Sequence, residues 1–129
     1  MTFLDVTLAD VIAGGVTRAY KSNEVPDRPT YPYTVVVVTE DLPGNYGLDG
    51  SHGTKSVRAT LRSYDNDIDG ALDFDRMATA ALQDHMPVFA GYETTPWRKQ
   101  VGSVEVRDPD NRGVEGVTTT LLCTISATN

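Results

Sequence analysis

Cysteine and long apolar runs are what this sequence most clearly lacks. Cys123 is the single cysteine among 129 residues, so no internal disulfide can form and the chain needs no oxidising compartment to fold. It lies in the apolar stretch 121–125, where we expect a small buried thiol. The longest apolar run is 35–38, whereas a membrane span needs about 20 residues. With no basic N-terminal start typical of a signal peptide, the sequence predicts a soluble cytosolic protein without a membrane partner.

Basic residues are also in the minority. The chain has 11 Lys and Arg against 18 Asp and Glu, which gives a formal net charge of −7. Because DNA binding depends on Lys and Arg displacing the counterions of the phosphates, this balance argues against a DNA-binding regulator. The length suits one core and is too short for two, so we expect a single domain over 1–129.

Motifs for catalysis are missing as well. His52 and His85 are the only histidines, and neither has a second His or Cys at zinc-ligand spacing. There is no G-x-S-x-G nucleophile elbow, and the glycines between 41 and 53 are not followed by the Lys-Ser/Thr of a phosphate-binding loop. We therefore expect no enzyme, no catalytic residues and no cofactor.

Apolar periodicity predicts two helices. The first covers 3–12, with apolar residues at i, i+4, i+7 and i+8, and ends at Gly14-Gly15. The second covers 70–85, with a period near 3.6, Asp69 as its N-cap and Pro87 after its end.

Alternation and β-branched residues predict the strands. They cover 33–40, 55–64, 103–107 and 114–126, with a brief further strand within 16–22, and the last two form a hairpin. Residues 92–97 fit neither pattern. Each amphipathic element must bury its apolar side, so the sequence predicts an α+β fold: a mainly antiparallel sheet of four to five strands with two helices packed on one face.

Two segments are expected to form neither helix nor central strand. Three prolines fall within Pro26–Pro32, which excludes both. Four glycines and a proline fall within 41–53, which predicts a long Gly-rich loop. Loops of this length are often functional, so we expect a contact element here.

The segment 65-DNDIDG-70 has two interpretations. It fits the opening of a calcium loop, with Asp65, Asp67 and Asp69 as ligands. However, Arg76 occupies the twelfth position, where a bidentate carboxylate is needed, and a strand precedes the loop where a helix should. The alternative, which this mismatch favours, is an acidic strand-to-helix connection that caps the second helix.

Two further segments together resemble a known family. The Pro-rich entry into a valine strand, 26-PDRPTYPYTVVV-37, and the late hairpin segment, 104-VEVRDPD-110, resemble the tail terminator (tail completion) proteins of long-tailed bacteriophages. The similarity in length, acidic balance and element order extends over most of the chain. The sequence departs from the family in its short first helix and in the Gly-rich excursion after Glu40.

The resemblance implies a hexameric ring on the head-proximal end of the tail tube, which stops tube polymerisation and forms the joint to the head connector. The implied partners are other copies of the chain, the tube protein and the connector or head completion protein. DNA passes through the ring without sequence-specific binding, and an acidic lumen would repel its phosphates. The implied location is the tail-neck junction of the virion, after assembly in the host cytoplasm.

A closed ring needs two different contact patches on each subunit. The candidate interface residues, drawn from the Pro-rich segment, the Gly-rich loop and the loop aromatics, are Asp27, Arg28, Tyr31, Leu42, Asn45, Tyr46, Leu48 and Trp97. The aromatic members could equally seal the core. Two alternative functions stay open: another small head-tail neck or connector protein, and a calcium-binding module built on residues 65–70.

Overall fold

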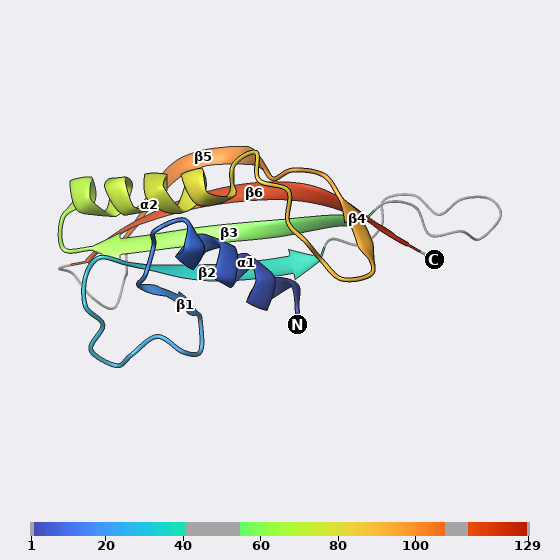
Figure 1. Cartoon of the computed structure of the whole chain (residues 1–129). Coiled ribbons are helices and arrows are strands. Elements are labelled where there is room, and N and C mark those ends of the chain that lie inside the picture. Colours follow the sequence, from blue (N-terminus) through green and yellow to red (C-terminus); the bar gives the residue numbers. More distant parts are fainter. Residues whose placement is uncertain (1, 41–54, 108–113, 129) are drawn as a thin grey trace.

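The computed structural model of the chain describes residues 2–40, 55–107 and 114–128, with only the backbone for 101–107 (Figure 1). In chain order the elements are α1 (Phe3–Ala13), β1 (Ala19–Lys21), β2 (Tyr33–Glu40), β3 (Lys55–Asp65), α2 (Ile68–Leu82), β4 (Tyr92–Thr94), β5 (Arg98–Arg107) and β6 (Glu115–Ala127). The predicted Gly-rich loop at 41–53 lies outside the described residues.

The sheet is built around three long antiparallel strands. β3 pairs with β6 along its whole length on one side and with all of β2, over residues 57–64, on the other. The strand order is β1-β2-β3-β6-β4, and β5 also pairs with β6. The α+β fold is confirmed, but the sheet has six strands and is mixed, because β1 runs parallel to β2. The proline-containing segment 22–32 accounts for this: it carries the chain back before β2 begins, so the two strands are not joined by a hairpin.

The late strands are longer than their sequence pattern indicates. The hairpin of β5 and β6 is confirmed. However, β5 begins at Arg98, before the predicted start at 103, because two register shifts between Lys99 and Val104 break its alternation. A short β4 also lies within the stretch 92–97 that fitted neither pattern, and it pairs with the end of β6.

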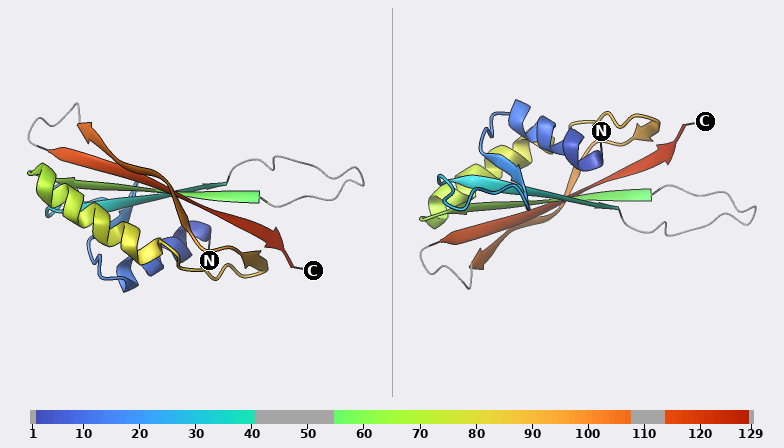
Figure 2. Two further views of the ribbon diagram at one scale, coloured as in Figure 1. Left: turned by 90° about the horizontal axis from the view of Figure 1, so that it is seen from above. Right: turned by 90° about the horizontal axis from the view of Figure 1, so that it is seen from below.

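Both helices lie on one side of the sheet, as predicted. Figure 2 shows α2 in front of the strands from above and behind them from below. α1 begins with a capping box between Thr2 and Asp5. Its C-cap, Gly14, lies so close to Ala81 of α2 that a Cβ at position 14 would clash, which explains a glycine there. Neither helix in the described ranges has the length and apolar character of a membrane span.

The ends of α2 differ from the prediction. Asp67 is the N-cap, in place of Asp69, because its carboxylate accepts the backbone N–H of Asp69. The helix ends at Leu82, before His85, and the chain then turns through Asp84, whose φ is positive. The helix therefore stops before Pro87 can affect it.

The core lies between the helices and one face of the sheet, which we call the covered face. Its strand positions are fully or almost fully buried: Val57, Ala59, Leu61, Leu121, Cys123 and Ile125. Phe74, Ala78 and Leu82 of α2 and Val11 of α1 belong to the same cluster. Burial of Cys123, predicted from its apolar neighbours, is confirmed, and it raises the pKa of the thiol to about 12.

Candidate interaction surfaces

The opposite face of the same strands, which we call the open face, has no helix over it. Because side chains alternate along a strand and paired residues share a face, the register of β2, β3 and β6 assigns its members. They are Tyr33, Val35, Val37, Thr39, Ser56, Arg58, Thr60, Arg62, Tyr64, Gly116, Thr118, Thr120, Leu122, Thr124 and Ser126. None of these positions is acidic, in a chain whose net charge is −7. By register Glu93 of the short β4 lies on the same side, opposite Ser126 at one end of β6.

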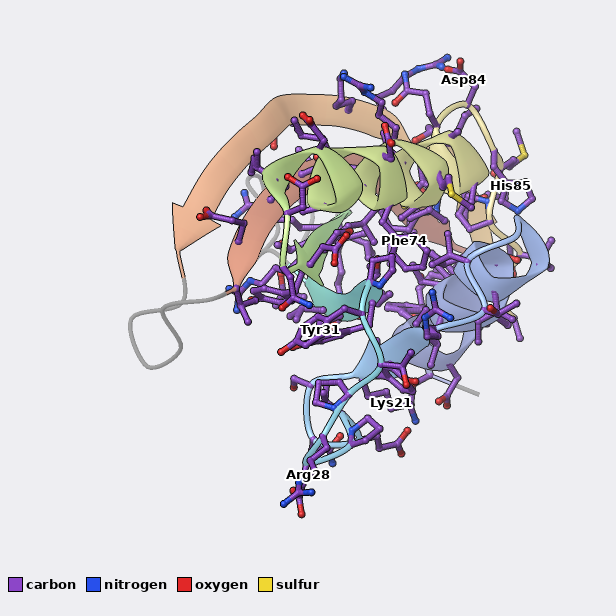
Figure 3. The ribbon with its side chains drawn as sticks, turned by 90° about the vertical axis from the view of Figure 1, so that its left-hand side faces the viewer. Lys21, Arg28, Tyr31, Phe74, Asp84 and His85 are labelled. Carbon is purple, nitrogen blue, oxygen red and sulfur yellow. The ribbon has the colours of Figure 1, made fainter. Side chains whose placement is uncertain are left out.

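One end of the open face carries four tyrosines, which we call the tyrosine cluster: Tyr20, Tyr31, Tyr33 and Tyr64. The ring of Tyr33 lies at the centre, with centroids 5.3 Å from Tyr64, 5.5 Å from Tyr31 and 6.3 Å from Tyr20. All four rings are half-buried. Tyr31, predicted as an interface candidate, thus lies beside the start of β2 (Figure 3).

Arg62 lies next to this cluster and is exposed. Its strand partners are Val35 on β2 and Thr118 on β6, so it stands in the middle of the three strands. Tyrosine and arginine are the residues most enriched at protein interfaces and at their energetic hot spots. The end of the open face that carries the tyrosine cluster and Arg62 therefore has residue types typical of protein interfaces, whereas Thr, Ser and Val make up most of the rest.

The outer side of α2 has the opposite charge. Asp69, Asp73 and Met77 follow one another at i, i+4 and i+8, so they form one exposed row, which we call the acidic stripe. Met77 is 43% exposed. Arg76 reaches Asp73 at 3.4 Å, but both side chains are more than two-thirds exposed, so this ion pair contributes little.

The three calcium candidates do not form a metal site. The carboxylate of Asp65 accepts the backbone N–H of Asn66 and lies where a Cβ of Gly70 would be. Asp67 accepts the N–H of Asp69 as the helix cap. Within the part of the chain that the structure describes, no three His, Cys, Asp or Glu side chains gather as metal ligands. The capping interpretation of residues 65–70 is therefore the one that the structure supports.

The other interface candidates lie in different environments. Asp27 and Arg28 are exposed, and Arg28 lies at the tip of the segment 22–32, pointing away from the molecule (Figure 3). Trp97 is fully buried and packs edge-on against Phe89, so its role is to seal the core and its assignment to an interface was wrong. Leu42, Asn45, Tyr46 and Leu48 lie outside the described residues.

An apolar groove lies near the N-terminus of α1. Its volume is about 540 Å3, and Phe3, Val6, Val88, Phe89 and Tyr92 supply its apolar lining. Val88 is 81% exposed and Met86, nearby in sequence, is 54% exposed. Sequence analysis did not indicate this groove, because its walls come from segments far apart in the chain.

Ion pairs and a buried polar contact hold the layers together. Lys21 of β1 lies 2.7 Å from Asp5 of α1. Their hydrogen bond, together with the backbone N–H and the side chain of Thr2, holds the pKa of Asp5 well below its usual range, and the pKa of Lys21 is raised. Inside the core, the hydroxyl of Thr119 donates to the carboxylate of Asp75 at 2.6 Å, which ties α2 to β6.

Comparison with solved structures gives a likeness in fold. No protein-family model and no curated protein matches the chain. Among solved structures, it is similar to a chain of the "Virion of native gene transfer agent (GTA) particle", with a TM-score of 0.72. The match covers 95% of this chain and 93% of that chain at 11% sequence identity. The two chains therefore share a fold over almost their whole length.

Proposed function

We propose that the protein is a structural component of a phage-like particle and acts as its tail terminator. In this role it caps the head-proximal end of the tail tube as a hexameric ring, stops tube polymerisation and forms the joint to the head connector. The observation that carries the proposal is the shared fold with a chain of a gene transfer agent virion, at a TM-score of 0.72 over 95% of this chain.

A second line of support is independent of that likeness. The segments 26–37 and 104–110 resemble tail terminator proteins in sequence. Resemblance in sequence and likeness in fold thus point to the same kind of particle, although they come from different comparisons.

The arrangement of surfaces also suits a ring. A ring is closed by heterologous contacts, in which two different patches of each subunit meet. This chain has two exposed surfaces of unlike character on opposite sides of its sheet: the open face with Arg62 and the acidic stripe with Asp73. The net charge of −7 would also weaken adhesion of DNA as it passes through the ring.

The test is a capping experiment. Purified tail-tube protein from the same particle is polymerised with and without the full chain, and tube lengths and ends are examined by electron microscopy. We expect shorter tubes with a ring of about six subunits at one end, whereas an acidic protein of similar size and charge should leave the tubes unchanged. Unchanged tube lengths with bare ends would refute the terminator role.

The capping experiment, extended by a binding measurement, distinguishes the terminator role from the alternative neck role. A neck or connector component would bind purified head connector and leave tube polymerisation unaffected. Light scattering after gel filtration, with each partner added in turn, distinguishes the two outcomes.

A further inference from the structure

We propose that the open face of one copy packs on the acidic stripe of the next copy, and that this head-to-tail contact builds the ring. The inference rests on the proposed function and deepens it by naming the two patches that meet. Arg62 is the central residue of the first patch, and Asp73 is the central residue of the second.

Charge complementarity is the first argument. The open-face positions of β2, β3 and β6 include Arg58 and Arg62 and no acidic residue. The acidic stripe presents Asp69 and Asp73, both exposed, and Arg76, the neighbouring cation, lies 3.4 Å from Asp73 in an exposed ion pair. Complementary potentials steer two surfaces together, whereas like charges placed opposite each other cost several kcal/mol.

The same charges exclude the symmetric alternatives. If two open faces met about a two-fold axis through their centres, the exposed Arg62 of one copy would face that of the other. If two acidic stripes met, the carboxylates of Asp69 and Asp73 would face each other. Only the contact between unlike patches pairs opposite charges, and it is the heterologous type that a ring requires.

Apolar chemistry supports the same contact. Half-buried Val37 and Leu122 lie on the open face, and Met77 is 43% exposed on the acidic stripe. Methionine adapts its shape to irregular apolar surfaces. The tyrosine cluster beside Arg62 provides rigid aromatic area of the kind that anchors interfaces.

A protein partner fits the open face better than nucleic acid does. Arginines 58 and 62 are its only basic side chains on the three central strands, and Arg58 is half-buried. Tight DNA binding takes about 6–10 phosphate contacts. Two arginines, set among valines and threonines in an acidic protein, do not provide them.

The test uses two charge-reversed variants of the full chain. Arg62→Glu places a carboxylate opposite the acidic stripe, and Asp73→Arg places a cation opposite the open face. Each variant alone should associate at least about tenfold more weakly than the natural chain, measured by light scattering after gel filtration and by ring formation on tube ends. Both residues are exposed, so circular dichroism and melting temperature should show an intact fold.

Mixing the two variants gives the decisive result. In an alternating ring, Glu at position 62 of one copy meets Arg at position 73 of the next, and the following contact is the natural pair. The equimolar mixture should therefore recover rings of even subunit number, although neither variant forms them alone. A symmetric interface would give pairs and no rings, and a loss of folding would give no recovery at all.

Glu24→Arg is the matched control for Asp73→Arg. It makes the same reversal of charge on an exposed residue outside both patches, so it should leave association unchanged. If the natural chain forms rings and Arg62→Glu still forms them, this inference is wrong while the terminator role stands. The inference is equally wrong if Glu24→Arg alone prevents assembly, or if Arg62→Glu loses only binding to a DNA duplex. If the natural chain assembles in no condition, with or without tubes, both proposals fail.

Discussion

Leu61 and Arg62 are neighbours on one strand, yet they serve opposite faces of the sheet. The side chain of Leu61 is fully buried under the helices, whereas that of Arg62 is exposed on the open face. The same alternation runs through β6, where Leu121 is fully buried and Leu122 is only half-buried. Alternate residues of the central strands are therefore constrained by packing against the helices, while most of the residues between them keep some exposure, with Val35, 7% exposed, as an exception.

The two faces also differ in their polar chemistry. On the covered face, polar side chains are buried and paired, as in Thr34 with Ser63 at 2.8 Å and Thr119 with Asp75. On the open face, Thr60, Thr118 and Thr120 are half-buried and near water. Hydroxyl pairing on the covered face is thus buried, whereas on the open face the pair of Thr124 with Thr95, at 3.0 Å, is exposed.

The largest expected difference between the faces is in apolar packing. Leu61→Ala removes a fully buried side chain from the covered face and should cost about 3 kcal/mol of unfolding free energy. Thr60→Ala, one residue away on the open face, should cost less than about 1 kcal/mol. Urea unfolding of both variants checks this, and equal losses would mean that the open face also contributes to the core.

Loss of a buried hydrogen bond should give the next largest difference in stability between the two faces. Thr119→Val keeps the shape but removes the hydroxyl that donates to Asp75, so a cost of about 1–3 kcal/mol is expected. Thr120→Val makes the same change on the open face and should alter stability by less than about 0.5 kcal/mol. Chemical denaturation measures the free energy of unfolding of both variants. An unchanged value for Thr119→Val would show that the hydrogen bond between Thr119 and Asp75 does not contribute to stability.

Loss of the capping box of α1 should reduce stability by a smaller amount. Thr2→Ala removes the side chain that accepts the N–H of Asp5 at 3.1 Å and breaks the capping box of α1. The expected loss is about 1 kcal/mol. Thr39→Ala, at an exposed position of the open face, is the control and should have little effect on the melting temperature. A Thr2→Ala melting curve that matches the natural one would show that the cap contributes nothing.

The smallest expected effect is the pH dependence of the Asp5–Lys21 ion pair. Because the pKa of Asp5 is lowered in the folded chain, its stabilisation is present above the unfolded value of about 3.9 and is lost as the pH falls below it. Asp5→Asn should therefore be less stable than the natural chain at neutral pH, and the gap should begin to narrow as the pH falls below about 3.9. Asp73→Asn, whose ion pair is exposed, should show almost no gap. Urea midpoints measured from pH 7 to pH 3 test this, and a gap for Asp5→Asn that widens in acid would contradict it.

The long elements were predictable from the sequence because their periods are regular. The run of valines in β2, the alternation in β3 and β6 and the helical spacing in α2 each point to one structure. The short strands were not: β1 and β4 have three residues each, too few for a period to show. In β5 the two register shifts hide its first half.

The open face was predictable only in part. Arg58, Thr60 and Arg62 alternate with the core residues of β3, so the sequence alone indicates a polar side of this strand. The tyrosine cluster could not be foreseen, since it joins Tyr20, Tyr31, Tyr33 and Tyr64 through the register of three strands. The sequence could not assign Trp97 to the core or to an interface, because an aromatic residue next to a proline is compatible with both.

The buried thiol of Cys123 makes the chain its own reporter of unfolding. Its sulfur lies on the covered face, 3% exposed, and the raised pKa keeps it in the unreactive thiol form. A thiol-reactive dye can reach it only when the helices leave the sheet, so the labelling rate records how often the fold opens. Since Cys123 is the single cysteine, the rate at which its thiol is labelled can be measured without engineered probes, both in the free subunit and after assembly.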